Sequence, residues 1–318
     1  MGLFKKANET KSGLKVLGFG ATGTAKTTFA LSFPEIAAID SEDGMAWYKG
    51  KEQGKNLQLI VNTTSADEVE EALEEIEDEY MDDIKTFVID SETKIYENQQ
   101  HSGLNIAETR ARNKGQSVDD AGLSQREWGK IKMIGKRIQS SKIKLASQGI
   151  NIVSIAQEKA IKEKKGENWI TVGYEPDAGK GLAYDYDLVL RFFTEKDAMG
   201  KEIYKAEVRK DRTGVTKKGD ILENVTYEIW RAAVEGKADK TENIVDFKKD
   251  IKKDEIKMQS EFEELESLLN IFKSELKAKD KTVQSKVVAY SKEIGVDNPL
   301  KCVDLDKMKK LVEYIRSL

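Results

Sequence analysis

The segment from Gly20 to Thr27 has the residue types and spacing of a phosphate-binding loop. An apolar run at 14–19 precedes it, and apolar residues at helical spacing follow it until Pro34, as the motif requires. Glycines allow backbone N–H groups to curl around a phosphate, and the following helix adds its positive N-terminal end. In this arrangement the lysine reaches the β- and γ-phosphates, and the hydroxyl after it ligates Mg²⁺. We therefore expect ATP and Mg²⁺ to bind at Gly20, Ala21, Thr22, Gly23, Thr24, Ala25, Lys26, Thr27 and Thr28, with Thr27 on the metal.

Ala25 stands where this motif usually has a glycine before the lysine. The side chain of alanine is small, so we expect the backbone still to approach a phosphate. Similar Ala-Lys endings occur in the loops of MoxR-type and minichromosome-maintenance ATPases, which favours a functional site. The alternative is a chance Gly/Thr-rich turn, and the flanking strand and helix argue against it.

A mainly parallel sheet is expected to carry this loop, because apolar runs alternate with helical patterns. We predict helices from Ser65, with apolar residues up to Tyr80, and from Ser124 to about Ala146, each opened by a capping-box pattern. The predicted strands of this part are 14–19, 36–40, 57–61, 84–91 and 150–156.

One of these strands ends in an acid, Asp90. The carboxyl ends of parallel strands share one edge of the sheet, so Asp90 is expected beside the phosphate-binding loop. A carboxylate there holds the water shell of Mg²⁺, which makes Asp90 the second predicted metal residue.

Two basic segments are predicted to bind nucleic acid. Residues 92–123 lack periodicity and are expected to form a mobile loop that contains Arg110, Arg112 and Lys114. The second segment, a predicted hairpin or flexible loop around Gly166, contains Lys162, Lys164, Lys165 and Trp169. A cationic groove tracks a single strand while an aromatic residue stacks on its bases. Packing of Trp169 in the core or in the hairpin is the alternative.

The chain is expected to divide into an arm at 1–13, an α/β domain at 14–232, a charged linker at 233–257 and a small helical domain at 258–318. The last part of the α/β domain is predicted to hold strands at 187–192 and, antiparallel, 204–209. The helical domain follows from apolar residues at helical spacing, which return after the linker.

The composition limits the function classes. With 39% hydrophobic and 35% charged residues among 318, and no apolar run of membrane-spanning length, we expect a cytosolic protein without a membrane partner. A single cysteine and a single histidine argue against a disulfide framework or a zinc site. The net charge of −4 disfavours binding of nucleic acid over the whole surface, so a local basic groove would be required.

With these motifs in order, residues 14–232 resemble RecA-like P-loop ATPases, and among them the phage single-strand annealing recombinases of the Sak group. The segment 39–42 resembles the RecA segment whose glutamate activates water, which points to Glu42 as a catalytic residue beside Lys26. Gln157 resembles the glutamine that senses the γ-phosphate. Residues 210–214 resemble the Lys-x-Arg-x-Gly motif of DnaB and bacterial RadA, which implies that Lys210 and Arg212 reach a neighbouring subunit's site.

The resemblance implies an ATP-dependent recombinase that binds single-stranded DNA, anneals or exchanges strands, and works as a homo-oligomer, either ring or filament. If phage-encoded, it would act in the cytoplasm of a bacterial host. Two alternatives stay open. One is a helicase or helicase-associated ATPase. The other is a nucleotide-gated interaction module whose helical domain docks a phage or host protein.

Overall fold

The computed structural model describes residues 12–235 and 245–318, which fall into two compact units divided between Val245 and Asp246. Most of the predicted arm and part of the predicted linker lie outside the described residues. The predicted fold class is confirmed: the first unit is α/β with a mainly parallel sheet, and the second is a small helical unit. No helix in the described ranges is long and apolar enough to cross a membrane.

The sheet of the first unit runs in the order β3-β2-β4-β5-β1-β7-β8-β9, with β6 paired to β5. The strands from β3 to β7 in this order are parallel, while β6, β8 and β9 pair antiparallel. Their bounds are β1 Lys15–Gly20, β2 Ile36–Asp40, β3 Leu57–Val61, β4 Thr86–Asp90, β5 Asn151–Lys165, β6 Asn168–Pro176, β7 Leu188–Lys196, β8 Glu202–Asp211 and β9 Ile221–Glu223.

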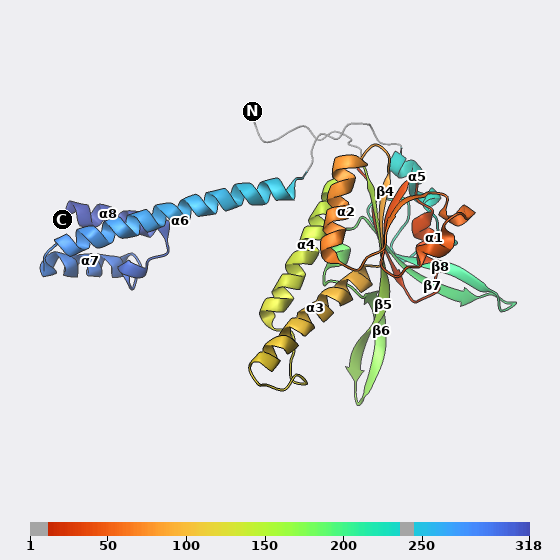
Figure 1. Ribbon diagram of the computed structural model, residues 1–318, viewed down its shortest axis with the longest axis horizontal. Coiled ribbons are helices and arrows are strands. Elements are labelled where there is room, and N and C mark those ends of the chain that lie inside the picture. The colour runs from red at the N-terminus through yellow and green to blue at the C-terminus, as the bar shows by residue number, and fades with distance from the viewer. Residues whose placement is uncertain (1–11, 236–244) are drawn as a thin grey trace. The chain divides into compact units, whose positions relative to one another are not determined.

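Helices cover both faces of this sheet, as Figure 1 shows. Strand residues alternate between the faces, so Leu17 and Phe19 join one core cluster while Val16 joins the other. One layer contains α2 Ala66–Glu79, α3 Glu92–Asn113 and α4 Gln125–Ser147; the other contains α1 Lys26–Leu31 and α5 Glu228–Glu235. Short 3-10 turns lie at Met45–Tyr48, Glu52–Gly54 and Leu182–Asp185.

The prediction of a mobile loop over 92–123 is wrong for most of its length, because α3 occupies Glu92–Asn113. The buried positions of this helix include Thr93, Gly103, Ala107 and Ala111. Small residues allow a helix face to be buried where the neighbouring elements lie close. They leave no periodic pattern of large apolar residues in the sequence, and such a pattern is what indicates a helix.

The second unit packs three helices around its own core, α6 Phe247–Ala278, α7 Lys281–Glu293 and α8 Leu305–Ser317, with a 3-10 turn at Pro299–Lys301. Aspartates at 246, 280 and 304 cap the three helices with their side chains. Residues 247–257, predicted as linker, are therefore helical. Lysine and glutamate are good helix formers, so a charged stretch with few apolar residues need not be an irregular connection.

Candidate nucleotide site

The phosphate-binding loop connects the end of β1 to the start of α1 and has a fixed backbone shape. Gly23 and Ala25 both have positive φ, 71° and 68°. A side chain at Gly20 would meet the carbonyl oxygen of Phe192 at 2.2 Å, so only glycine fits beside β7. Ala25 therefore differs from the usual glycine in backbone strain as well as in size. An alanine with positive φ costs roughly 1–2 kcal/mol.

The predicted metal residues lie in contact. The Thr27 hydroxyl donates a 2.6 Å hydrogen bond to Oδ2 of Asp90. β4 ends at Asp90 one strand away from β2, and Asp90 is level there with Asp40. A hydroxyl and a carboxylate are oxygen ligands of the kind that Mg²⁺ prefers, so this pair fits the ion.

The carboxylate of Asp40 shapes the turn after β2. It accepts hydrogen bonds from the backbone N–H groups of Glu42, Gly44 and Met45, at 3.3, 3.1 and 2.7 Å. This turn directs Glu42 toward the end of β4. There the Ser91 hydroxyl donates to Oε1 of Glu42 at 2.8 Å.

The predicted γ-phosphate sensor contacts the predicted general base. Gln157 Nε2 donates to the same Oε1 of Glu42 at 3.0 Å. The backbone N–H of Gln157 donates in turn to the Thr93 hydroxyl at 2.9 Å, which fixes β5 against the start of α3. Two donors from different elements therefore orient one carboxylate oxygen.

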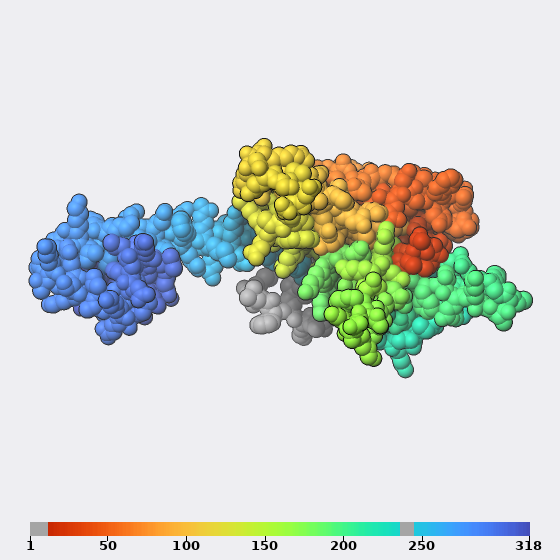
Figure 2. Space-filling view, turned by 90° about the horizontal axis from the view of Figure 1, so that it is seen from below, coloured from red at the N-terminus to blue at the C-terminus, as the bar shows by residue number. Residues whose placement is uncertain are grey.

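These residues line one cavity of about 550 Å³ at the carboxyl edge of the sheet. Figure 2 looks onto this edge, where the red loop segment lies between the orange residues after β2 and the green hairpin. All residues predicted for phosphate and metal line the cavity, together with Glu42 and Gln157. Sequence reasoning missed Tyr48, Ser91, Ile155, Glu158 and Tyr174, which also line it.

The charges of this cavity are unbalanced. Lys26 is the single basic residue among the described residues that line it, against the acids Glu42, Asp90 and Glu158. Burial, with help from Glu42 and Asp40, raises the pKa of Asp90 to about 6, although the hydrogen bond from Thr27 opposes this. Burial also lowers the pKa of Lys26, which the nearby carboxylates oppose. Lys26 Nζ donates to the carbonyl oxygen of Ala21 at 2.6 Å.

Lys210 and Arg212 lie at the other edge of the sheet. In the β-ladders, Lys210 is level with Val189 near the start of β7, while the loop at Gly20 is level with Phe192. Lys210 Nζ donates to the carbonyl oxygens of Ala183 and Tyr184 at 3.2 and 3.0 Å. Arg212 pairs with Asp187 at 3.4 Å and keeps 59% of its side chain exposed. The structure does not bring this motif into its own nucleotide cavity.

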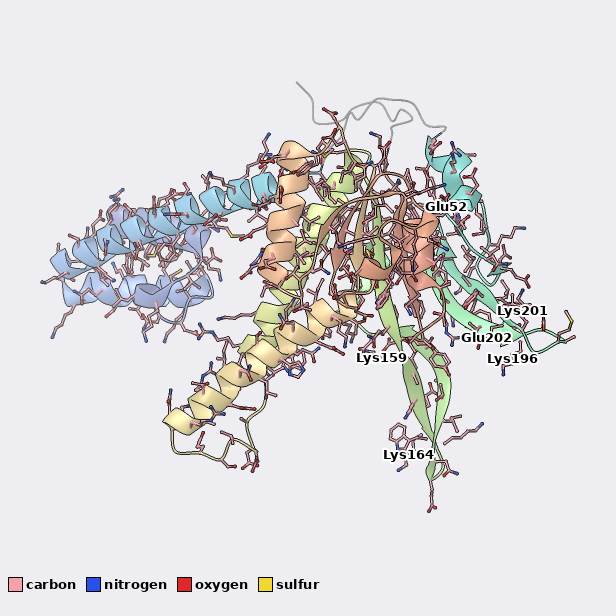
Figure 3. The ribbon with its side chains drawn as sticks, turned by 45° about the vertical axis from the view of Figure 1, so that its right-hand side comes forward. Glu52, Lys159, Lys164, Lys196, Lys201 and Glu202 are labelled. Atoms are coloured by element: carbon pink, nitrogen blue, oxygen red, sulfur yellow. The ribbon has the colours of Figure 1, made fainter. Side chains whose placement is uncertain are left out.

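The hairpin of β5 and β6 carries the second predicted DNA segment, and its strands reach further than the predicted end at 156. Lys164 is paired with Trp169 and Lys162 with Thr171, so these side chains share one face. Trp169 is 65% exposed, which excludes the alternative of core packing. Lys165, opposite Asn168, belongs to the other face. Figure 3 shows Lys159 near the root of the hairpin and Lys164 near its tip.

The root of this hairpin is held at the nucleotide cavity. Arg191 of β7 pairs with Glu158 at 2.8 Å, and its guanidinium lies 3.9 Å from the centre of the Tyr174 ring. Glu158 and Tyr174 both line the cavity. The hairpin part of β5, which carries the exposed lysines, therefore starts next to the residues predicted to contact the phosphates.

The first predicted DNA segment lies on the last turn of α3 and has acidic partners. Arg110 pairs with Glu127 at 2.9 Å and Arg112 with Glu108 at 3.1 Å. Lys114 follows as the C-terminal cap residue of α3. Two of its three cations are thus already paired inside the protein.

Comparison with known proteins identifies the family. The sequence model of the family described as AAA domain matches residues 12–220. The chain belongs to this AAA domain family. The match covers strands β1 to β8 and every element of the nucleotide cavity, so the loop is that of a P-loop ATPase domain. No curated protein matches the chain, and nothing in the comparisons bears on the resemblance to the phage Sak group.

Among solved structures, the chain is similar to the RadB recombinase. The likeness covers 67% of this chain and 87% of that one, with 16% identical residues and a TM-score of 0.40. At these values it carries no argument about function. The family match places the chain in the AAA domain family, and its sheet and phosphate-binding loop agree with this.

Proposed function

We propose that this AAA domain protein hydrolyses ATP in an oligomer and uses the nucleotide cycle to anneal or exchange single-stranded DNA. One observation carries the proposal. The residues predicted to contact phosphate, to hold the metal and to activate water line one cavity at the carboxyl edge of the sheet, while the Lys-x-Arg motif lies at the opposite edge. One chain would therefore supply the residues of the nucleotide cavity, and a second chain would supply the cations of the Lys-x-Arg motif.

Lys26 would hold the β- and γ-phosphates, and Thr27 and Asp90 would hold Mg²⁺. When bound, the ion would supply positive charge against the charge that develops on the transferring phosphate. Glu42 would accept the proton of the attacking water, since Ser91 and Gln157 fix its carboxylate near the loop. A positioned carboxylate base of this kind contributes about 10²–10⁴ in rate.

The nucleotide base would occupy a second hollow of about 470 Å³ that adjoins the phosphate cavity. It shares Gly23, Ala25, Thr28 and Tyr48 with the phosphate cavity, so one bound molecule can extend from one into the other. Its further lining comes from Phe29, Phe192, Tyr204, Lys205, Asn224, Val225 and Thr226. Aromatic rings beside an amide suit a planar base with polar edges.

Charge balance supports a contribution from a second chain. ATP brings several negative charges to a cavity where one lysine faces three carboxylates. Lys210 and Arg212 do not correct this in their own chain. Lys210 is level with Leu17, three residues before the loop at Gly20, and its ammonium group points to the carbonyl oxygens of Ala183 and Tyr184; Arg212 is level with the start of β1. The exposed Arg212 is suited to a neighbour's γ-phosphate, where an arginine finger is worth about 10³–10⁵ in rate.

Single-stranded DNA would bind to the face of the β5–β6 hairpin that carries Lys162, Lys164 and Trp169. Alternating cations and an exposed aromatic ring serve the backbone and the bases of a strand together. Gln157 precedes this hairpin in the same strand and contacts Glu42. Movement of Gln157 toward a γ-phosphate would therefore be transmitted directly to the DNA-binding face.

ATP turnover with and without single-stranded DNA, together with annealing of complementary strands, tests this proposal. We expect DNA to stimulate turnover and ATP to accelerate annealing without opening a forked duplex. Unwinding of the fork would indicate a helicase-associated ATPase instead. Turnover that stays at background with DNA present would indicate a nucleotide-gated interaction module.

A further inference from the structure

A buried cluster of polar side chains lies in the core of the first unit. Lys142 of α4 is fully buried, and its ammonium group donates a hydrogen bond to Glu92. It also donates to the Ser154 hydroxyl at 3.3 Å and to the Tyr186 hydroxyl at 3.2 Å. The Tyr186 hydroxyl donates to Ser154 at 2.6 Å, and the Ser154 hydroxyl donates to Oε1 of Glu92 at 2.6 Å. None of these four residues lines the nucleotide cavity.

The cluster holds an ion pair in one geometry. Burial acts to lower the pKa of Lys142, but the charge of Glu92 and the contact with Tyr186 outweigh this, and the pKa is raised above its ordinary value. Lys142 is therefore an ammonium group, and each of its three protons has an acceptor. A buried ion pair is often no more stabilising than apolar residues of similar volume, so stability alone does not account for it. A fully hydrogen-bonded pair does restrict how α4, β5 and the start of α3 lie against one another.

Glu92 is the first residue of α3 and lies between two residues that contact the predicted catalytic pair. On one side, the Ser91 hydroxyl donates to Glu42 at 2.8 Å. On the other side, the Thr93 hydroxyl accepts the backbone N–H of Gln157 at 2.9 Å, and the Gln157 side chain donates to Glu42. A displacement of Glu92 would move its two neighbours in the chain. The orientation of Glu42 and Gln157 therefore depends on where the first turn of α3 is held.

We propose that Lys142 and Glu92 are positioning residues for the hydrolysis of ATP. Their ion pair fixes the first turn of α3 against α4 and β5, and this turn keeps the Glu42 carboxylate in its place at the nucleotide cavity. Ser154 adds a second hold, because it donates to Glu92 from the strand in which Gln157 follows three residues later. The inference rests on the function proposed for the nucleotide cavity.

Replacement of the whole pair tests this role. Lys142→Met with Glu92→Leu removes both charges together, so the free energy of unfolding should stay close to that of the unaltered chain. The turnover number should fall by on the order of tenfold, because a displaced catalytic group is less effective, while the affinity for ATP should be unchanged. A pair variant that folds and is as active as the unaltered chain would overturn the inference.

Ile138→Ala is the matched control for this variant. Ile138 lies one turn earlier on α4, is 4% exposed and packs in the core, so its truncation lowers the free energy of unfolding. It has no part in the hydrogen bonds of the cluster, and turnover should persist at temperatures where the variant is folded. An equal loss of turnover in Ile138→Ala and in the pair variant would overturn the inference, because any loosening of α4 would then suffice.

Combination with Glu42→Gln shows whether the pair acts through Glu42. In this background the pair variant should lower the residual single-turnover rate much less than it does in the unaltered chain, since the group that it positions no longer accepts a proton. The same fold-loss in both backgrounds would overturn the inference, because a pair that only supports the fold acts equally in each.

Hydrogen exchange of the chain without nucleotide provides a measurement that does not depend on ATP turnover. The N–H of Gln157 should exchange faster in the pair variant, and also in Ser154→Ala, a milder change that keeps both charges and applies even where the pair variant does not fold. The N–H of Val153, in the same strand between β1 and β4, should keep its rate. Unchanged exchange at Gln157 in the folded variants would overturn the inference. An unaltered chain that hydrolyses no ATP would instead overturn the proposed function, and with it the catalytic role of the pair, even where the Gln157 N–H responds.

Discussion

The two edges of the central sheet are built from the same strands but carry different chemistry. At the carboxyl edge, tight turns after β1, β2 and β4 gather a loop of backbone N–H groups, one lysine and several carboxylates in a shared cavity. At the other edge, Lys210 and Arg212 lie beside backbone carbonyls and Asp187, without any residue of that cavity. The first edge holds the residues predicted to bind ATP and activate water, and the second holds two cations that do not reach that cavity in their own chain. This difference supports the proposal that the catalytic unit is formed between two chains.

Among the changes proposed, removal of the Arg212 guanidinium at the second edge should lower ATP turnover the most. Arg212→Ala should lower ATP turnover by about 10³-fold or more, because a finger that stabilises transferring phosphate contributes 10³–10⁵. Binding of nucleotide should persist, since the first edge is intact. Arg209→Ala is the control. Arg209 precedes the motif on the same strand and pairs with Glu207. Equal turnover in Arg212→Ala and the control would contradict a catalytic second edge.

At the first edge, Glu42→Gln should retain ATP binding and lose turnover by about 10²–10⁴-fold, since an amide positions water but accepts no proton. Single-turnover hydrolysis and nucleotide titration separate the two quantities. Ser91→Ala removes one of the two donors to Glu42 and should have a smaller effect. Loss of nucleotide binding in Glu42→Gln would show that Glu42 shapes the site and takes no part in the chemistry.

The buried carboxylate of Asp90 at the first edge should also lower the free energy of unfolding when nucleotide and Mg²⁺ are absent. The pKa of Asp90 is raised from 3.8 to about 6, so above pH 6 the folded chain carries a buried charge that the unfolded chain carries in water. Asp90→Asn should therefore raise the free energy of unfolding by up to about 3 kcal/mol above pH 6. The gain should shrink as pH falls through 6 and vanish near 3.8.

Denaturant unfolding of both proteins at several pH values measures this difference. With Mg²⁺ and ATP present the order should reverse, because the carboxylate then has a cation to bind. A stability difference that is independent of pH would contradict the assignment of the raised pKa to Asp90.

Neutralising the two basic segments should have a smaller effect, which concerns the affinity for single-stranded DNA. Neutralising Lys162, Lys164 and Lys165 should lower the slope of log affinity for single-stranded DNA against log salt by about 1.4, because the two lysines on the DNA-binding face contribute about 0.7 each. Neutralising Arg110, Arg112 and Lys114 should change it less, because two of these cations already have acidic partners. A larger change in the salt slope for the variant of Arg110, Arg112 and Lys114 would indicate that single-stranded DNA binds at the end of α3.

The sequence predicted the first edge well because its parts are local. A loop between a strand and a helix, and acids directly after strands, are placed by short-range geometry and by the rule that parallel strands end together. Asp90, Thr27 and Glu42 therefore converge as expected. The contact between Gln157 and Glu42 could not be predicted from local pattern, since it depends on how β5 and the turn after β2 lie in three dimensions.

Other features could not be predicted from the sequence, for physical reasons. The small buried residues of α3 leave no apolar period in the sequence. Arg112 pairs with Glu108 one turn away, which could be predicted only if this segment was known to be helical, and the pair of Arg110 with Glu127 depends on how α3 packs against α4. Tyr48 and Tyr174 gave no signal beyond being aromatic. The position of Lys210 at the opposite edge follows only from the antiparallel pairing of β8 with β7.

A mixing experiment tests the two-chain site most directly. Lys26→Ala leaves the second edge sound but removes the lysine of the loop, and Arg212→Ala does the reverse. Each variant alone should be nearly inactive. In a mixture, some junctions combine an intact loop with an intact Arg212, so part of the ATP turnover should return. A mixture that stays as inactive as its components, while both proteins demonstrably co-assemble, would contradict a site shared between chains.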